Sequence, residues 1–377
     1  MTADDGGPTP SGNRVGDSPT PSKDRVGDSP TPPGGRVVAV PCEGANVLAL
    51  FALDTGEPLG EVPVGSHPVH ATAHRGGTFV ATMGERAVTA VAPDGEVVRI
   101  ETGVLGPSHF AVANGDLFIS CSAGDALAVI DPERLTLLDR IGVGAEPHEV
   151  AVSTDGRRLY AGSRRDGVVD VVDPAARERI GSIPIGANAR VQGVAIAPDG
   201  SRGYAVDQRG ARVVAFDTGR GRGGGGDAAE DGTRDAGSPA TDAVVADAPV
   251  GADPYDLVAT ADRVFVPGRD DGTVHEFDPD LERVAIHDGF SRPVDLFELG
   301  SDRWVLDAGA ARLRSLGGEA IETPAPGLVA TRVDPGDRPA RLVVSHYDDD
   351  LLSLVDVESG TVWTVETPAY PFGTAIV

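Results

Sequence analysis

The sequence predicts a closed β-propeller, a ring of four-stranded antiparallel sheets. Three observations indicate this fold class: a unit of about 40 residues that recurs along the chain, four short β-rich runs within each unit, and a final segment that supplies the strand missing from the first unit. We expect an all-β chain in which residues 36–377 form one propeller of eight blades, with seven as the alternative count.

The clearest unit runs from Glu146 to Gly186 and contains four β-rich runs. They are predicted as strands at Val150–Ser153, Arg158–Ser163, Val168–Val172 and Arg179–Ile185. Asp-Gly and Asp-Pro pairs separate the runs, and β-branched residues are frequent within them. Short runs of this kind are typical of an antiparallel meander rather than of helices.

Unit ends recur at a nearly constant spacing. Glycines and one proline mark them at positions 65, 103, 144, 186, 251, 289, 327 and 368. The single long interval, from 186 to 251, contains a stretch rich in Gly, Ala and Asp, residues 219–243, which we expect to be a disordered insertion. Without this stretch, the intervals between successive unit ends all have the length of a four-stranded propeller blade.

The two ends of the repeat region complement each other. The first unit, 36–65, contains three predicted strands and lacks the innermost one. The chain ends with Tyr370–Val377, which matches an innermost strand and has no others after it. We therefore expect this segment to pair with Arg36–Pro41 and complete the first blade. Residues 1–35 contain a near-exact duplication rich in Pro, Ser, Gly and Asp, and we expect them to form a disordered tail.

Two segments resemble the YVTN family of β-propeller repeats. They are "PHEVAVSTDGRRLYAGS" from Pro147 and "VQGVAIAPDGSRGYAVD" from Val191. The tetrapeptide that gives the family its name is replaced by Tyr160-Ala161-Gly162-Ser163 in the first segment. The resemblance extends over nearly all of 36–377 and implies the propeller fold. It implies no particular activity, since members of that family are mostly of unknown function and include cell-surface and periplasmic proteins.

The charge composition indicates adaptation to high salt. The chain has 58 acidic and 32 basic residues, a formal net charge of −26, and Lys23 is its only lysine. Molar salt reduces the Debye length to about 3 Å and so screens the repulsion among surface carboxylates. We expect an acidic protein of the haloarchaeal type. Nucleic acid is excluded as a partner because its phosphates would be repelled and no arginine stripe with interleaved aromatics is present.

Two cysteines and the absence of an export signal bear on the compartment. Cys42 and Cys121 fall at equivalent places in non-adjacent units, which predicts Cα atoms too far apart for a disulfide. The N-terminal sequence has no basic and apolar signal-peptide pattern, and no apolar run reaches the roughly 20 residues of a membrane span. We expect a monomeric cytoplasmic protein without a membrane partner.

A ring of polar residues is predicted at one mouth of the central channel. The units align on the proline before each innermost strand, and the residue two positions later should face the axis. Imidazoles and carboxylates occupy five of these positions: His70, His109, Glu149, Asp256 and Asp295. His148 and Tyr255, one position earlier, extend the rim. Such groups suit a polar ligand or a divalent metal ion, with His70, His109 and Glu149 as the expected metal ligands.

A structural role is the alternative for these residues, because an acidic or small residue at this turn can cap backbone N–H groups of the next blade. No G-x-S-x-G elbow or phosphate-binding lysine is present, so no catalytic residue is assigned. The predicted function is a non-catalytic module that binds a protein or a small ligand at the channel mouth. Two alternatives stay open: a metal-assisted hydrolase of the lactonase kind that uses the same ring, and a structural interaction hub.

Overall fold

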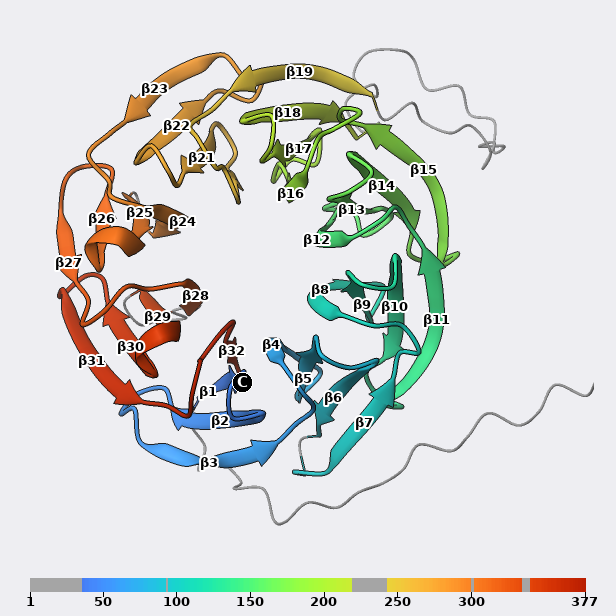
Figure 1. The fold of residues 1–377 in the computed structure, drawn as a ribbon, viewed down its shortest axis with the longest axis vertical. Coiled ribbons are helices and arrows are strands. Elements are labelled where there is room, and N and C mark those ends of the chain that lie inside the picture. Colours follow the sequence, from blue (N-terminus) through green and yellow to red (C-terminus); the bar gives the residue numbers. More distant parts are fainter. Residues whose placement is uncertain (1–35, 93, 219–242, 300–301, 334–339) are drawn as a thin grey trace, which may run out of the picture.

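Eight four-stranded antiparallel sheets form a closed ring around a central axis (Figure 1). The computed structural model describes residues 36–92, 94–218, 243–299, 302–333 and 340–377. The predicted fold class and the count of eight blades are confirmed, and the alternative of seven is excluded. The predicted tail, 1–35, lies outside the described residues, as does the predicted insertion, 219–243, except for its last residue.

The first four blades follow one another along the chain, and the strands of each are named from the innermost to the outermost. Blade 1 contains β32 (Ala375–Ile376), β1 (Val37–Cys42), β2 (Val47–Ala52) and β3 (Pro58–Pro63). Blade 2 contains β4 (Pro68–His74), β5 (Gly77–Thr82), β6 (Ala87–Val91) and β7 (Val97–Glu101). Blade 3 contains β8 (Pro107–Ala113), β9 (Asp116–Cys121), β10 (Ala126–Asp131) and β11 (Thr136–Gly142). Blade 4 contains β12 (Pro147–Val152), β13 (Leu159–Ser163), β14 (Val168–Asp173) and β15 (Glu178–Pro184).

The other four blades repeat the same meander. Blade 5 contains β16 (Val191–Ile196), β17 (Arg202–Asp207), β18 (Arg212–Asp217) and β19 (Val244–Pro249). Blade 6 contains β20 (Val258–Ala259), β21 (Val264–Gly268), β22 (Thr273–Phe277) and β23 (Arg283–His287). Blade 7 contains β24 (Pro293–Leu299), β25 (Asp302–Asp307), β26 (Arg312–Ser315) and β27 (Ala320–Glu322). Blade 8 contains β28 (Val329–Val333), β29 (Arg341–His346), β30 (Leu351–Asp356) and β31 (Thr361–Glu366).

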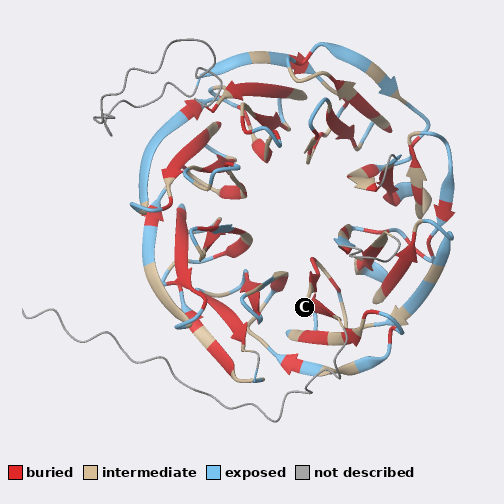
Figure 2. Cartoon of the chain, turned by 180° about the vertical axis from the view of Figure 1, so that it is seen from behind, coloured by how far each residue is buried: buried red, intermediate tan, exposed pale blue. Residues whose placement is uncertain are grey.

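The hydrophobic core lies between neighbouring blades. Figure 2 shows buried residues on the inner and middle strands and exposed residues gathered on the outermost ones. Tyr160 of blade 4 and Phe216 of blade 5 illustrate the packing: both side chains are fully buried, and their ring centroids are 5.3 Å apart. Each blade therefore buries a face against the next, which stabilises the ring through the removal of apolar surface from water.

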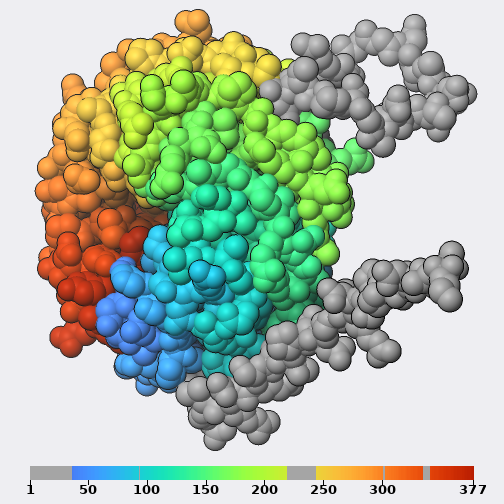
Figure 3. Space-filling model, turned by 45° about the vertical axis from the view of Figure 1, so that its right-hand side comes forward, coloured from blue at the N-terminus to red at the C-terminus, as the bar shows by residue number. Residues whose placement is uncertain are grey.

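The C-terminal strand closes the ring, as predicted. β32 pairs with β1 in antiparallel register, with Val38 opposite Ile376 and Ala39 opposite Ala375. Val37 N–H also donates to Val377 O over 2.9 Å. The last part of the chain, in red, thus lies against the first described part, in blue, on the surface drawn in Figure 3.

A β-bulge near the start of the innermost strand recurs in five blades. In blade 4, Pro147 pairs with Ser163 and Val150 with Ala161, so one extra residue stands on β12. Blades 2, 3, 5 and 7 show the same shift. A bulge interrupts the strict alternation of side chains along a strand. Consecutive residues at the bulge, such as His148 and Glu149, need not point to opposite faces.

The predicted absence of a disulfide is confirmed, since Cys42 and Cys121 are free and buried. Two three-residue 3₁₀ helices, η1 (Ala308–Ala310) and η2 (Tyr347–Asp349), lead into the third strands of blades 7 and 8. No helix of the described chain has the length and the apolar character that crossing a bilayer requires.

Candidate ligand site at the channel mouth

A cavity of about 490 Å³ opens where the innermost strands converge. Six of the seven residues predicted from the sequence line it: His70, His109, Glu149, Tyr255, Asp256 and Asp295. The seventh, His148, lies behind this lining and contacts both His109 and Tyr255 through its ring. The structure therefore brings together residues that are up to 225 positions apart in the sequence, because each lies on, or just before, the innermost strand of a blade.

Three imidazoles form an arc across blades 2, 3 and 4. The ring centroids of His70 and His109 are 4.6 Å apart, and those of His109 and His148 are 4.2 Å apart. Tyr255 of blade 6 continues the arc, its ring lying edge-on to His148 at 5.7 Å. Aromatic and imidazole rings at these separations are in direct contact.

His148 is held by blade 5 and by Tyr255. Its Nδ1 lies 3.0 Å from the carbonyl oxygen of Gln192 and donates to it. Its Nε2 lies 3.2 Å from Nε2 of Gln192 and 3.2 Å from the Tyr255 hydroxyl, both of which donate. These contacts define the neutral tautomer with the proton on Nδ1 and the lone pair on Nε2.

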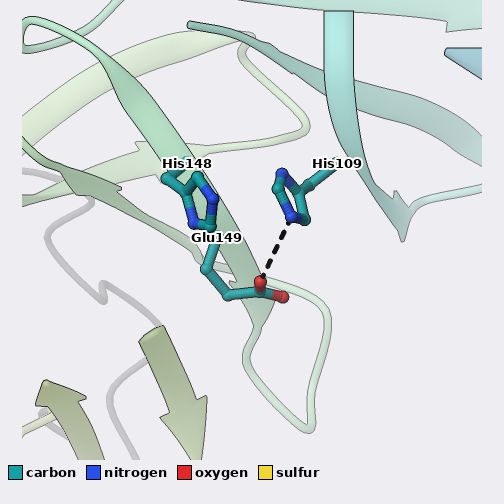
Figure 4. A group of neighbouring side chains, drawn as sticks. All are labelled: His109, His148 and Glu149. Carbon is teal, nitrogen blue, oxygen red and sulfur yellow. Dashed lines mark ion pairs between the residues drawn. The ribbon is translucent and has the colours of Figure 1, made fainter. Parts of the chain in front are cut away.

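His109 has a buried nitrogen without a hydrogen-bond partner. No described residue forms a hydrogen bond with its Nδ1, which is excluded from solvent. Its Nε2 is 3.8 Å from Oε2 of Glu149, an ion-pair distance too long for a hydrogen bond (Figure 4). Buried polar groups in folded proteins are nearly always satisfied, so the Nδ1 atom of His109 is an exception that calls for an explanation.

Three side chains could hold a metal ion together. His109, His148 and Glu149 each offer one donor atom, and these atoms all lie within 4.8 Å of one another (Figure 4). This group differs in one member from the set predicted from the sequence, since it contains His148 in place of His70. His70 lies next to it, in ring contact with His109 and edge-on to Phe372 at 5.1 Å.

The cavity also contains three carboxyl groups that have no arginine partner among the described residues. Asp256 accepts the N–H of the next residue over 2.7 Å, and Asp295 does the same over 2.8 Å. Burial raises the pKa of all three, Glu149 to about 8 and Asp295 well above its usual value. Repulsion adds to this, because Asp256 and Asp295 raise the pKa of Glu149, and Asp256 that of Asp295.

The imidazoles are shifted in the opposite direction. Burial lowers the pKa of His70 to about 4 and that of His148 also to about 4, although the Gln192 carbonyl opposes the second shift. Burial and the two neighbouring imidazoles lower the pKa of His109 well below its usual value. All three are therefore neutral at pH 7 and can offer a nitrogen lone pair.

The remaining lining is apolar or already paired. Arg269 is the one arginine of the described cavity lining, but its guanidinium forms a 2.7 Å ion pair with Asp253 and stacks 4.3 Å above the Tyr255 ring. Val294, Leu328 and Phe372 form an apolar side. A ligand would thus meet imidazoles on one side, carboxylates on another and apolar groups between blades 7 and 1.

Sequence reasoning missed Gln192, Phe372 and Arg269. The first two stand in the same repeat position as His148 and Tyr255, one residue before the axial ring, so the alignment contained the signal. Arg269 follows the second strand of blade 6, and no repeat position pointed to it. Its place depends on the pairing with Asp253 across a turn, which only the structure shows.

Known proteins resemble this chain only in structure. The sequence matches no protein-family model and no curated protein. Dihydro-heme d1 dehydrogenase NirN, solved in complex with DHE, has a TM-score of 0.68 at 14% identity, over 94% of this chain and 77% of that one. AztD from Citrobacter koseri has a TM-score of 0.59 at 13% identity, over 91% and 97%. The periplasmic gluconolactonase PpgL of Pseudomonas aeruginosa has a TM-score of 0.54 at 16% identity, over 91% and 99%.

These similarities show the fold alone. Two of the three structures are enzymes by name, with different activities, which agrees with the general rule that a propeller scaffold does not specify a function. Any functional argument for this chain must come from its own channel-mouth residues. The resemblance to YVTN repeats stays a prediction.

Proposed function

We propose that this protein is a non-catalytic binding module of the YVTN-like propeller type that takes a small, positively charged ligand at its channel mouth. One observation carries the proposal: Glu149, Asp256 and Asp295 share one cavity, and none pairs with an arginine among the described residues. Burying carboxylates without counter-charge is costly. A cationic ligand would remove that cost.

The size and shape of the cavity support a small ligand. Its volume of about 490 Å³ falls within the usual range of about 300–1,000 Å³ for small-molecule sites. The neutral imidazoles and the Tyr255 hydroxyl supply hydrogen-bonding groups, and Phe372 and Leu328 supply apolar contact. Polar groups at fixed positions in a small-molecule site determine the orientation of the bound molecule.

Thermal stability with charged probes tests this function. We expect n-butylammonium to raise the Tm of the protein in a saturable way, and butyrate, an anion of similar size, to leave it unchanged at equal ionic strength. A ligand at 100 times its Kd stabilises by about 2.7 kcal/mol. The Asp256→Asn/Asp295→Asn double variant should lose the response, and the exposed Asp302→Asn variant should keep it. Equal responses to both probes would contradict the proposal.

A metal-assisted hydrolase is the second candidate. The observation that favours it is the position of His109, His148 and Glu149 at the edge of an open cavity, which leaves room for a small substrate beside a bound ion. A metal held there would supply Lewis-acid activation of a carbonyl. Lactone hydrolysis followed in a pH-stat, with zinc-treated protein and with its His109→Ala variant, tests this candidate. No difference between the two would exclude it.

A further inference from the structure

Three ligand-type side chains converge between blades 3 and 4. His109 comes from β8, and His148 and Glu149 are consecutive residues of β12. Consecutive residues of a regular strand point to opposite faces. The bulge between Pro147 and Val150 breaks that alternation, so both side chains reach the neighbourhood of His109 (Figure 4). Bulges that redirect side chains are frequent beside functional sites.

His148 has the hydrogen bonding of a metal ligand. Metal-bound imidazoles usually donate the N–H of the second ring nitrogen to a carbonyl or carboxylate, which fixes the ring and its tautomer. Here Nδ1 donates to the Gln192 carbonyl over 3.0 Å, and Nε2 keeps the lone pair. Tyr255 and the Gln192 amide, each 3.2 Å from Nε2, currently donate to that lone pair and would have to release it.

His109 supplies a second, independent indication. Its buried Nδ1 forms no hydrogen bond with the described chain, and its Nε2 faces Glu149 at 3.8 Å. In a tetrahedral zinc site with bonds of about 2.0–2.1 Å, donor atoms lie roughly 3.3 Å apart. The 3.8 Å separation therefore needs a side-chain shift of less than about 1 Å. Glu149, one-third exposed, has the freedom to make it.

We infer that His109, His148 and Glu149 bind one divalent transition-metal ion, zinc by the chemistry of the donors. Two imidazole nitrogens and one carboxylate oxygen suit zinc better than calcium or magnesium, which prefer oxygen alone. Three protein ligands leave a fourth position open toward the cavity, the arrangement of a reactive or exchangeable site rather than a closed structural one. This metal site goes beyond the proposed function and shares only Glu149 with the carboxyl groups on which that function rests.

Metal stoichiometry tests the inference. The purified protein is stripped with a chelator, incubated with zinc chloride in molar salt, freed of excess ion and measured by mass spectrometry. We expect one zinc per chain in the parent and below about 0.1 in His109→Ala and in His148→Ala. His70→Ala is the matched control, because His70 is an adjacent imidazole outside the group. It should retain one zinc.

Two further measurements guard against indirect effects. Circular dichroism and Tm must show each variant folded, and cobalt(II) loading should give the visible absorption of a four-coordinate N/O site in the parent and in His70→Ala only. Tyr255→Phe should keep one zinc and lower its Kd by up to about tenfold, because it removes a hydroxyl that otherwise donates to the Nε2 lone pair of His148. No zinc in the parent, or full zinc in His148→Ala, overturns the inference. If the metal site is overturned in either way but butylammonium still raises the Tm of the parent protein, the proposed function stands without the metal.

Discussion

At the residue scale, both the acidic and the basic groups of the channel mouth have pKa values that are shifted in favour of their neutral forms. The carboxyl groups have raised pKa values and the imidazoles lowered ones, in both cases mainly because burial disfavours the charged form. Such groups weaken the folded state in the absence of a ligand. Clustered, strongly perturbed groups in a cavity are more frequent at functional sites than elsewhere.

Asp295→Asn should stabilise the ligand-free protein at alkaline pH. The folded pKa of Asp295 is raised well above the value of about 3.9 in the unfolded chain. Between these values the folded state keeps a proton that the unfolded state releases, so stability falls as pH rises. Asparagine removes this loss. We expect a gain on the order of 1 kcal/mol at pH 8, the free energy of a single pKa unit, that disappears below pH 4.

Urea unfolding at pH 4 and pH 8 measures that gain. The exposed Asp302→Asn variant is the control and should follow the parent at both pH values. A variant that is less stable than the parent at pH 8 would show that the Asp295 carboxylate is needed in the folded protein, and that its backbone contacts outweigh burial.

The sequence predicted which residues lie at the mouth but not which of them touch. Aligned repeat positions fall at equivalent places in the ring, so His70, His109, Glu149, Asp256 and Asp295 were expected to converge. Contact between His109 and His148 depends on the β12 bulge and on the Gln192 carbonyl in the next blade. The bulge is a feature of strand pairing within blade 4, and the carbonyl contact joins blades 4 and 5, so alignment of the repeat positions reveals neither.

At the element scale, a buried aspartate fastens blade 4, and another fastens blade 7, to the connection that precedes the blade. In blade 4, the fully buried Asp170 accepts hydrogen bonds from Ser163 Oγ at 2.6 Å, Gly144 N–H at 2.8 Å and Arg179 Nε at 2.5 Å. Gly144 belongs to the connection from blade 3. In blade 7, the equally buried Asp307 binds Ser291 N–H and Arg312 in the same way.

Asp170→Ala should therefore destabilise the protein strongly. Hydrogen bonds to a charged group contribute about 1.5–3 kcal/mol each. The loss is smaller for Arg179, because its side chain is partly exposed and water can replace the lost partner. We expect a loss of about 2–4 kcal/mol in the free energy of unfolding. Chemical denaturation measures it. Asp139→Ala, at an exposed carboxylate on β11 that accepts the N–H of the next residue, should stay within about 0.5 kcal/mol of the parent.

The strands of blade 4 were predicted nearly as observed, with one informative difference. The second, third and fourth runs match β13, β14 and β15 to within one residue at each end. The first was predicted to start at Val150, whereas β12 begins at Pro147. Proline is tolerated as the first residue of a strand, and here it pairs with Ser163 across the bulge. The β-propensity of single residues cannot reveal that strand pairing continues on the far side of a bulge, as it does here at Pro147.

At the scale of the whole molecule, charge and closure control stability. The whole chain of 377 residues has a formal net charge of −26, and the outermost strands of the ring are exposed. Self-repulsion of this size opposes the compact state unless it is screened. The adaptation to molar salt that composition predicts rests on this argument.

Lowering the salt concentration should destabilise the protein. The Debye length grows from about 3 Å at 1 M to about 10 Å at 0.1 M, so carboxylates on adjacent blades begin to repel one another. We expect the Tm to fall by more than about 5 °C between 2 M and 0.1 M potassium chloride, measured by circular dichroism. Sorbitol at matched osmolarity should restore less of the loss than salt does. A Tm independent of salt would exclude halophilic adaptation.

The C-terminal segment joins three blades at once. Phe372 N–H donates to Pro41 O of blade 1 over 2.9 Å, and Gly373 exchanges hydrogen bonds with Val69 and Ala71 of blade 2. Thr374 and Phe372 also contact Thr331 and Ser345 of blade 8. The segment therefore completes blade 1 and also links that blade to its two neighbours, blades 8 and 2.

Deletion of Tyr370–Val377 should open the ring. It removes hydrogen bonds worth roughly 1 kcal/mol each and the buried contacts of Ala375 and Ile376, against a typical total stability of about 5–15 kcal/mol. It also exposes the edge of β1, and an unpaired edge strand promotes aggregation. We expect the truncated chain to unfold or aggregate, as measured by melting and light scattering. A synthetic peptide of the same eight residues, added in excess, should restore a cooperative transition, whereas a scrambled peptide should not. A truncated chain that stayed soluble with an unchanged Tm would falsify the role of this strand as the closure of the propeller.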